Sequence, residues 1–153
     1  MTKSLLSLLA SVAFLAAVTP PSANAATPSN GITAKRDIVL QTRQSWDGNR
    51  YTLYPKGRPE ITMLRLTIPP NSVLPWHTHP VISIGYVLSG TLTLRDRENG
   101  KTHVYQQGEG FAETVDIEHR GESGDTPTVL LLTYVGTPGV PTSVPAAGEK
   151  PEY

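Results

Sequence analysis

The chain has 153 residues, contains no cysteine, and carries 13 basic and 13 acidic residues, so its formal net charge is zero. This length accommodates one domain with a hydrophobic core, and the balanced charge lacks the basic surface that nucleic-acid binding requires. The absence of cysteine excludes disulfides, thiolate metal ligands and cysteine nucleophiles. Histidine remains as the side chain that favours transition metals, at His77, His79, His103 and His119.

Residues 1–25 predict a cleaved signal peptide. Lys3 supplies a positive charge, Leu5 to Val18 is apolar apart from two serines, and Ala23-Asn24-Ala25 fits the small-x-small rule for cleavage before Ala26. The apolar run is shorter than the roughly 20 residues that a membrane span needs, so we expect no stable membrane anchoring. The mature chain is then periplasmic or secreted; the alternative is a retained anchor.

Strands dominate the rest of the chain. Residues 26–36 predict a flexible lead-in, residues 137–153 an extended tail rich in proline and glycine, and residues 37–136 a β-barrel domain without helical spacing. Strands are expected at 37–42, 51–54, 60–69, 82–90, 91–97, 101–107 and 128–136. Core or cavity-lining positions are expected at Met63, Leu66, Leu88, Leu92, Leu94 and Phe111. Many short strands between turn residues predict an all-β sandwich or barrel with little or no helix after the signal peptide.

Asn99-Gly100 predicts a tight hairpin between two of these strands. Both residues tolerate the positive φ that a two-residue type I′ turn requires. Counting outward from this turn places Asp96 opposite His103. We therefore interpret His103 as a partner of Asp96 across the strands, with a role as metal ligand as the alternative.

His77 and His79 are separated by one residue, in the stretch "PWHTHP". Side chains at i and i+2 of a strand point to the same face, so the two imidazoles can approach one ion. H-x-H by itself is weak evidence. A metal site requires His119, 40 residues further on, to reach the same place.

The stretch "PPNSVLPWHTHPVISIGYVLSG", followed by "GEGFAETVDIEHRGES", resembles the paired motifs of the cupin superfamily. His77, His79 and Gly90 match the first motif, and Gly108 and His119 match the second. The resemblance covers roughly residues 60–135. It implies an antiparallel double-sheet jelly-roll barrel in which His77, His79 and His119 bind a metal.

The sequence also departs from these motifs. Asn71 stands in place of a glycine, Thr114 and Asp116 in place of a proline and a glycine, and Ser123 in place of an asparagine. Ser83 stands where the family has a metal-binding glutamate. Three neutral imidazoles without that carboxylate leave positions open for an anionic or chelating oxygen ligand.

Glu113 is the candidate to replace the missing carboxylate. It lies six residues before His119, and even spacing along a regular strand places both on one face. Facing the cavity, Glu113 would serve as general base, as a partner of the ligands or as an occasional ligand. The alternative is a rim carboxylate paired with Arg120 or Arg95.

The resemblance implies two functions of different classes. The first is a metal-dependent oxygenase or isomerase that acts on a small oxygenated molecule, with Fe, Mn, Ni, Zn or Cu as the divalent ion and Glu113 as the catalytic residue. The second is a non-catalytic module that binds or senses a small ligand or the metal, including a degenerate cupin that has lost its ion. The family resemblance also implies a homodimer, formed through an N-terminal strand such as residues 37–42.

Overall fold

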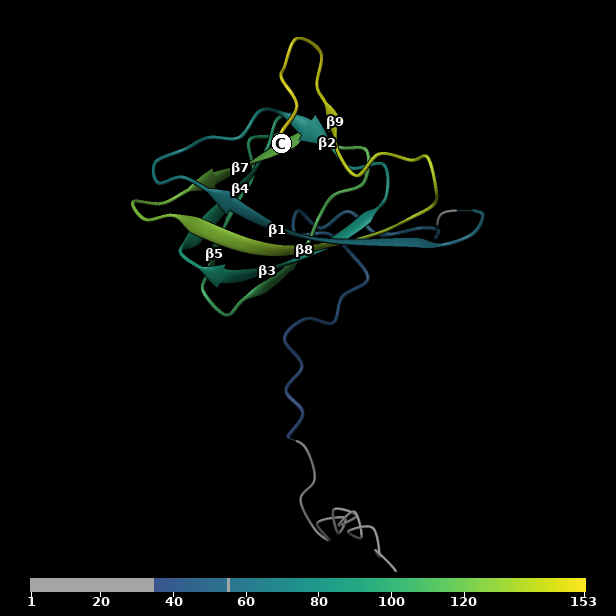
Figure 1. Cartoon of the computed structure of the whole chain (residues 1–153), viewed down its shortest axis with the longest axis horizontal. Helices are drawn as coiled ribbons and strands as arrows, with labels where there is room; N and C mark the ends of the chain where they lie inside the picture. Colours follow the sequence, from purple (N-terminus) through teal and green to yellow (C-terminus); the bar gives the residue numbers. More distant parts are fainter. Residues whose placement is uncertain (1–34, 55) are drawn as a thin grey trace, which may run out of the picture. The chain divides into compact units, whose positions relative to one another are not determined.

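The computed structural model describes residues 35–54 and 56–153, so the predicted signal peptide and nearly all of the lead-in lie outside the described residues. Arg36 to Tyr153 form one unit that contains strands and no helix within the described part (Figure 1). Accordingly, no described segment is a helix long and apolar enough to cross a membrane.

The strands form two antiparallel sheets. The first has the order β1 (Glu60–Ile68), β8 (Thr128–Gly136), β3 (Ile82–Ser89) and β6 (Gly110–Ala112). The second has the order β5 (Thr102–Gln106), β4 (Thr91–Asp96), β7 (His119–Ser123), β2 (His77–Thr78) and β9 (Val144–Pro145). Strands from distant parts of the chain are neighbours in both sheets, as in a jelly roll, and the expected all-β double-sheet fold is confirmed.

Five of the seven predicted strands are present, and two predictions were wrong. Residues 37–42 and 51–54 are not strands; only an isolated bridge between Gln44 and Arg50 forms nearby. Ile38 and Val39 are 58% and 55% exposed, so their β-branched side chains have no sheet face to cover. No separate strands were predicted at β6, β7 and β9. β6 and β9 have three and two residues, too few to show an alternating pattern, and β7 consists of polar residues and a glycine without alternating apolar side chains.

The predicted hairpin register was wrong by two residues. Leu94 pairs with His103 and Arg95 with Thr102, and the amide of Asp96 donates to the carbonyl of Lys101, so a four-residue loop replaces the two-residue turn. The Asp96 carboxylate accepts hydrogen bonds from the backbone amides of Glu98 (2.8 Å) and Asn99 (3.0 Å). This side chain competes with the tighter turn for the backbone donors. Asp96 therefore caps the loop and does not pair with His103.

Two of the motif departures lie at positions with left-handed backbone, where glycine is favoured. Asn71 has φ 52° and Asp116 has φ 58°. Asparagine and aspartate tolerate this region better than other non-glycine residues, because their short polar side chains bond locally. Both residues are therefore compatible with a position that the motif gives to glycine.

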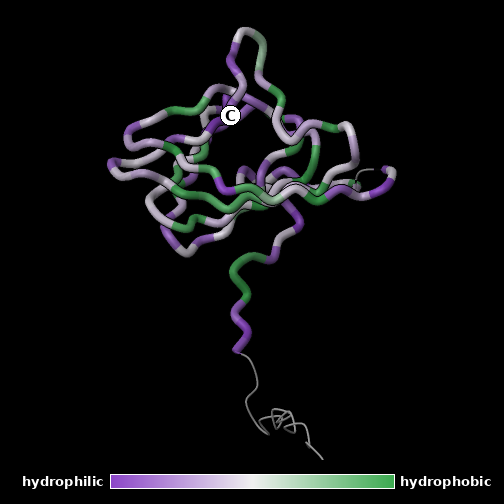
Figure 2. Tube along the Cα trace, in the orientation of Figure 1, coloured by the Kyte–Doolittle hydropathy of each residue, from purple (hydrophilic) through white to green (hydrophobic). Residues whose placement is uncertain are grey.

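The core lies between the two sheets. Hydrophobic residues concentrate along the strands, and hydrophilic residues mainly in the connections (Figure 2). The buried apolar cluster comprises Ile68, Val81, Val87, Leu92, Leu94, Phe111, Leu130, Leu132 and Tyr134. Leu92, Leu94 and Phe111 are thus core residues as predicted. Met63 is not: it is 63% exposed, because it lies on the outer face of β1.

Gly85 makes room for the ring of Phe111. A Cβ at Gly85 would lie 2.0 Å from Cζ of Phe111, and the Phe111 side chain is 1% exposed and has nowhere to move. Ser83, Gly85 and Val87 alternate along the inner face of β3, so this contact fixes the spacing between β3 and β6 beside the candidate site.

We predict that Gly85→Ala lowers the free energy of unfolding by at least about 1–3 kcal/mol, because overpacking a filled core forces strain. Urea denaturation measures the change. Gly124→Ala is the control, since a Cβ there meets Thr91 at an ordinary 3.5 Å. Equal stability of the Gly85 variant and the wild type would show that β3 and β6 adjust freely.

Candidate metal centre

Strand pairing brings His77 and His119 together. His77 opens β2, His119 opens β7, and the two residues are direct antiparallel partners. Directly opposed residues of an antiparallel pair point to the same face. His79 follows two residues after His77 and completes the cluster. Sheet register therefore assembles three side chains that are separated by up to 42 positions in sequence.

The three imidazoles converge on one centre. One potential ligand atom from each lies within 4.8 Å of the others. The ring centroids are separated by 4.7 Å for His77 and His119, 4.9 Å for His77 and His79, and 5.0 Å for His79 and His119. All three side chains are buried, with exposures of 2% or less. His103 is not part of the cluster: it lies exposed on β5 against the ring of Tyr105.

Backbone carbonyls fix the orientation of each ring. Nδ1 of His77 lies 2.8 Å from the Pro75 carbonyl, Nδ1 of His79 lies 2.7 Å from that of Thr142, and Nδ1 of His119 lies 2.9 Å from that of Ile117. A carbonyl only accepts, so each Nδ1 carries the proton and donates it. In a neutral ring Nε2 is then unprotonated, which is the tautomer and the orientation that metal-binding histidines use.

Burial keeps two of the imidazoles neutral. It lowers the pKa of His77 to about 3, with His119 and His79 acting in the same direction, and it also lowers the pKa of His79. For His119 burial opposes protonation, but the adjacent Glu113 outweighs it and leaves the pKa raised.

Glu113 faces the cluster from the opposite sheet. It follows β6, is 5% exposed, and places Oε2 3.2 Å from Nε2 of His119. The rim alternative is wrong, because Arg95 and Arg120 both pair with Glu122. The backbone amide of Glu113 donates to the carbonyl of Ser83 at 2.9 Å. Glu113 is thus the cross-strand neighbour of the position where the family's glutamate is missing.

A second carboxylate, Glu152, reaches the cluster from the C-terminal tail. Its Oε2 lies 3.3 Å from Nε2 of His77, and its side chain is 4% exposed. Burial raises the pKa of Glu152 to about 7 and lowers that of His77, so a charged pair does not explain this contact. Sequence analysis missed Glu152, because a lone acid in a tail rich in proline and glycine carries no pattern.

The unpaired polar atoms at this site fit a cation. Among the described residues, no hydrogen-bond partner reaches Nε2 of His119 or Oε2 of Glu113 and Glu152. Buried polar atoms are costly when unpaired, and here imidazole and carboxylate lone pairs face one another. Nitrogen and oxygen donors of this kind suit divalent transition metals. The residues present therefore match such an ion.

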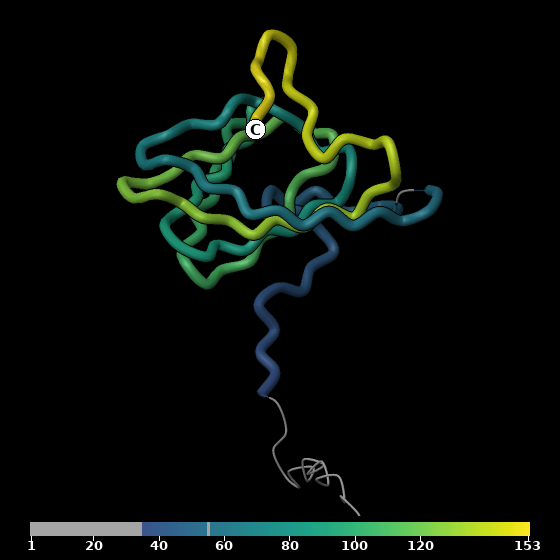
Figure 3. The backbone as a smooth tube through the Cα atoms, in the orientation of Figure 1, coloured from purple at the N-terminus to yellow at the C-terminus, as the bar shows by residue number. Residues whose placement is uncertain are grey.

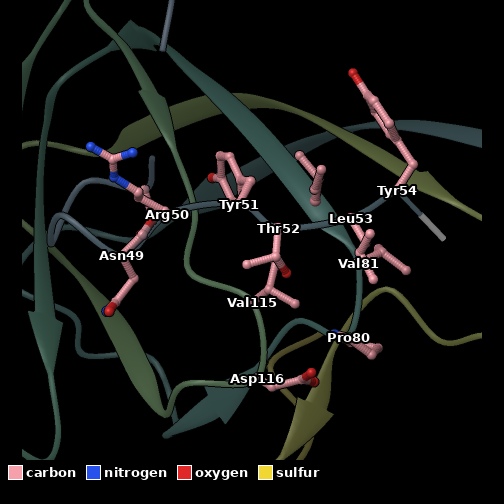
Figure 4. Close-up of a pocket in the computed structure, with 12 residues that line it drawn as sticks. Asn49, Arg50, Tyr51, Thr52, Leu53, Tyr54, Pro80, Val81, Val115 and Asp116 are labelled. Atoms are coloured by element: carbon pink, nitrogen blue, oxygen red, sulfur yellow. The ribbon is translucent and has the colours of Figure 1, made fainter. Parts of the chain in front are cut away.

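The cavity between these groups is small. Its volume is about 10 Å³, close to the minimum for one water molecule, and its lining includes His77, Glu113, His119 and Glu152. A larger surface pocket of about 360 Å³ lies outside this centre. The stretch from Asn49 to Tyr54 forms one side of that pocket, opposite residues such as Val115 (Figure 4). With the tail in place, the histidine centre therefore has room for an ion but not for a larger ligand.

Comparison with known proteins identifies the class of this domain. Residues 64–134 match the family model of the cupin domain. This segment includes His77, His79, Glu113 and His119. Residues 64–134 are therefore a cupin domain, as the motifs of the sequence indicated. No curated protein matches the sequence significantly.

Several solved structures align with this chain at low sequence identity. The DMSP lyase DddQ from Ruegeria pomeroyi aligns with a TM-score of 0.50 and 19% identity, over 56% of this chain and 43% of the lyase. The polyketide cyclase RemF from Streptomyces resistomycificus aligns with a TM-score of 0.48 and 21% identity, over 56% of this chain and 60% of the cyclase. An RmlC-like cupin from Shewanella frigidimarina aligns with a TM-score of 0.45 and 18% identity, over 52% of this chain and 69% of that cupin. The chain spans less than half of the lyase, and the likeness to the lyase concerns the fold alone.

Proposed function

We propose that this cupin binds one divalent transition metal ion through His77, His79 and His119. The observation that carries the proposal is the set of three hydrogen bonds from Nδ1 to backbone carbonyls, which aims the free Nε2 atoms at one point. Imidazole suits Fe, Ni, Zn and Cu, and carboxylates such as that of Glu113 suit Mn, so the donor set leaves the choice among these ions open.

We further propose a metal-dependent oxygenase or isomerase that acts on a small oxygenated molecule. A bound ion supplies Lewis acidity and orients the substrate. Glu113 supports this class, because it is buried beside His119 and places a carboxylate where a proton is to be held or moved. Burial raises the pKa of Glu113, but the imidazoles, His119 foremost, outweigh burial and leave it lowered. In the proposed reaction, Glu113 would act as the general base.

A non-catalytic cupin that binds or senses a metal or a small ligand is the second candidate. The cavity of about 10 Å³ favours it, since a substrate does not fit while the tail covers the site. Oxygen uptake and substrate loss, both measured for the metal-loaded protein with diketones, thiols and catechols, separate the two candidates. Turnover supports the enzyme, and binding without turnover supports the sensor.

Removing a histidine of the cluster is expected to abolish metal binding. We predict about one transition metal ion per chain in the wild type and almost none in His77→Ala and His119→Ala, because two imidazoles hold an ion far less tightly than three. Mass spectrometry of the purified protein measures the metal. His103→Ala is the matched control and keeps the ion. A wild type that takes up no metal under any loading condition would contradict the proposed function.

Exchanging the residues at 83 and 113 tests whether Glu113 takes the place of the missing carboxylate. We predict that Glu113→Ser weakens Co²⁺ affinity by about tenfold or more, the scale seen when a partner of a metal ligand is lost. Adding Ser83→Glu to that variant restores most of the affinity, since the two positions are cross-strand neighbours. Calorimetric titration measures both. If the double variant binds Co²⁺ no more tightly than Glu113→Ser, a carboxylate at position 83 does not replace the one at position 113.

We also propose export and self-association. The leader in the sequence supports cleavage before Ala26 and a periplasmic or secreted protein, and the intact mass of the mature chain checks it.

Apolar side chains on the outer face of the first sheet support a homodimer: Ile61, Met63 and Ile84 are 60%, 63% and 42% exposed. Sedimentation of the wild type beside Met63→Glu distinguishes a dimer from a monomer.

A further inference from the structure

The C-terminal segment, residues 142–153, is built into the metal centre. Figures 1 and 3 show it leaving β9 in a loop and returning so that the chain ends close to β2. In β9, Val144 and Pro145 pair with Thr78 and His77. The amide of Ala146 then donates to the carbonyl of Trp76 at 2.8 Å. The segment therefore forms part of the second sheet next to the histidines.

The same segment contacts the histidines at two points. The carbonyl of Thr142 accepts the hydrogen bond that orients His79, and the carboxylate of Glu152 lies against Nε2 of His77. The hydroxyls of Thr142 and Tyr153 lie 2.9 Å apart and connect the beginning of the segment to its end. These contacts hold the Glu152 side chain inside the protein, although it lies one residue from the end of the chain.

A structural ion pair does not account for Glu152. Nδ1 of His77 already donates to Pro75, so Nε2 presents a lone pair to Glu152 at 3.3 Å, and the two groups attract each other only when a proton or a metal ion lies between them. Within the described part of the chain, no hydrogen-bond donor satisfies Oε2 of Glu152. A metal ion between the two groups binds the lone pairs of both.

We propose that Glu152 is a metal ligand that the chain supplies from its own C-terminal segment. Its carboxylate completes the histidine set and closes the cavity, so an external ligand enters only by displacing it. This inference rests on the proposed metal binding and deepens it.

Titration of the metal-free full chain with Co²⁺ tests the proposal, with the visible absorption of Co²⁺ reporting the ligands. Glu152→Gln is expected to weaken the affinity by about tenfold or more and to change the spectrum, because an amide is a weaker donor than a carboxylate. Glu149→Gln is the matched control: it lies three residues earlier in the same segment, outside the cavity lining, and keeps the wild-type affinity and spectrum.

Rescue by added acetate tests whether a carboxylate binds the metal beside His77, and it does so within a single variant, whose own folding stability is the same with and without acetate. Glu152→Ala leaves space beside His77, and added acetate is expected to restore a wild-type-like Co²⁺ spectrum in this variant at concentrations that leave the Glu149→Gln protein unchanged. Unaltered affinity and spectrum in Glu152→Gln, or no effect of acetate on Glu152→Ala, overturn the role of Glu152 while the three-histidine site stands. A wild type that binds no Co²⁺ overturns the proposed function itself.

Discussion

The antiparallel contact between His77 and His119 is the constraint on which the site depends. β2 has only two residues, and a strand of that length has little stability of its own. It is held because β7 pairs with one of its edges and β9 with the other. The C-terminal tail thus supports the strand that carries His77, and the cluster is a consequence of the sheet order as much as of the histidines.

The donors around this centre come from three separate parts of the chain. The imidazoles belong to the second sheet, Glu113 follows a strand of the first sheet, and Glu152 comes from the C-terminal segment. An ion bound at their centre, as we propose, would link both sheets and the tail. Its binding energy would then contribute to folding, which is characteristic of metal sites that are incomplete in the unfolded chain. Apolar packing does not explain why the carboxylate oxygens of Glu113 and Glu152 are buried without hydrogen-bond partners.

The sequence predicted correctly those strands whose alternation of apolar and polar residues is long. Long alternating strands such as β1, β3 and β8 were predicted, because one buried face imposes a period of two. Within them, the choice of face for Met63 was wrong, since both faces of β1 carry apolar residues. The hairpin register failed because the Asp96 carboxylate binds the loop amides, a side-chain contact that turn propensities do not include. Residues 37–42 have strand composition but find no partner in the described fold.

The sequence by itself determined that this is an all-β cupin with His77, His79 and His119 as its candidate ligands, because motif spacing and strand period are local properties of the chain. Only the tertiary structure decided that Glu113 faces the cluster across from Ser83 and that Glu152 reaches it from the tail. Those placements depend on which strands become neighbours and on where the chain returns after β9. Such contacts join residues far apart in sequence, so no local pattern records them.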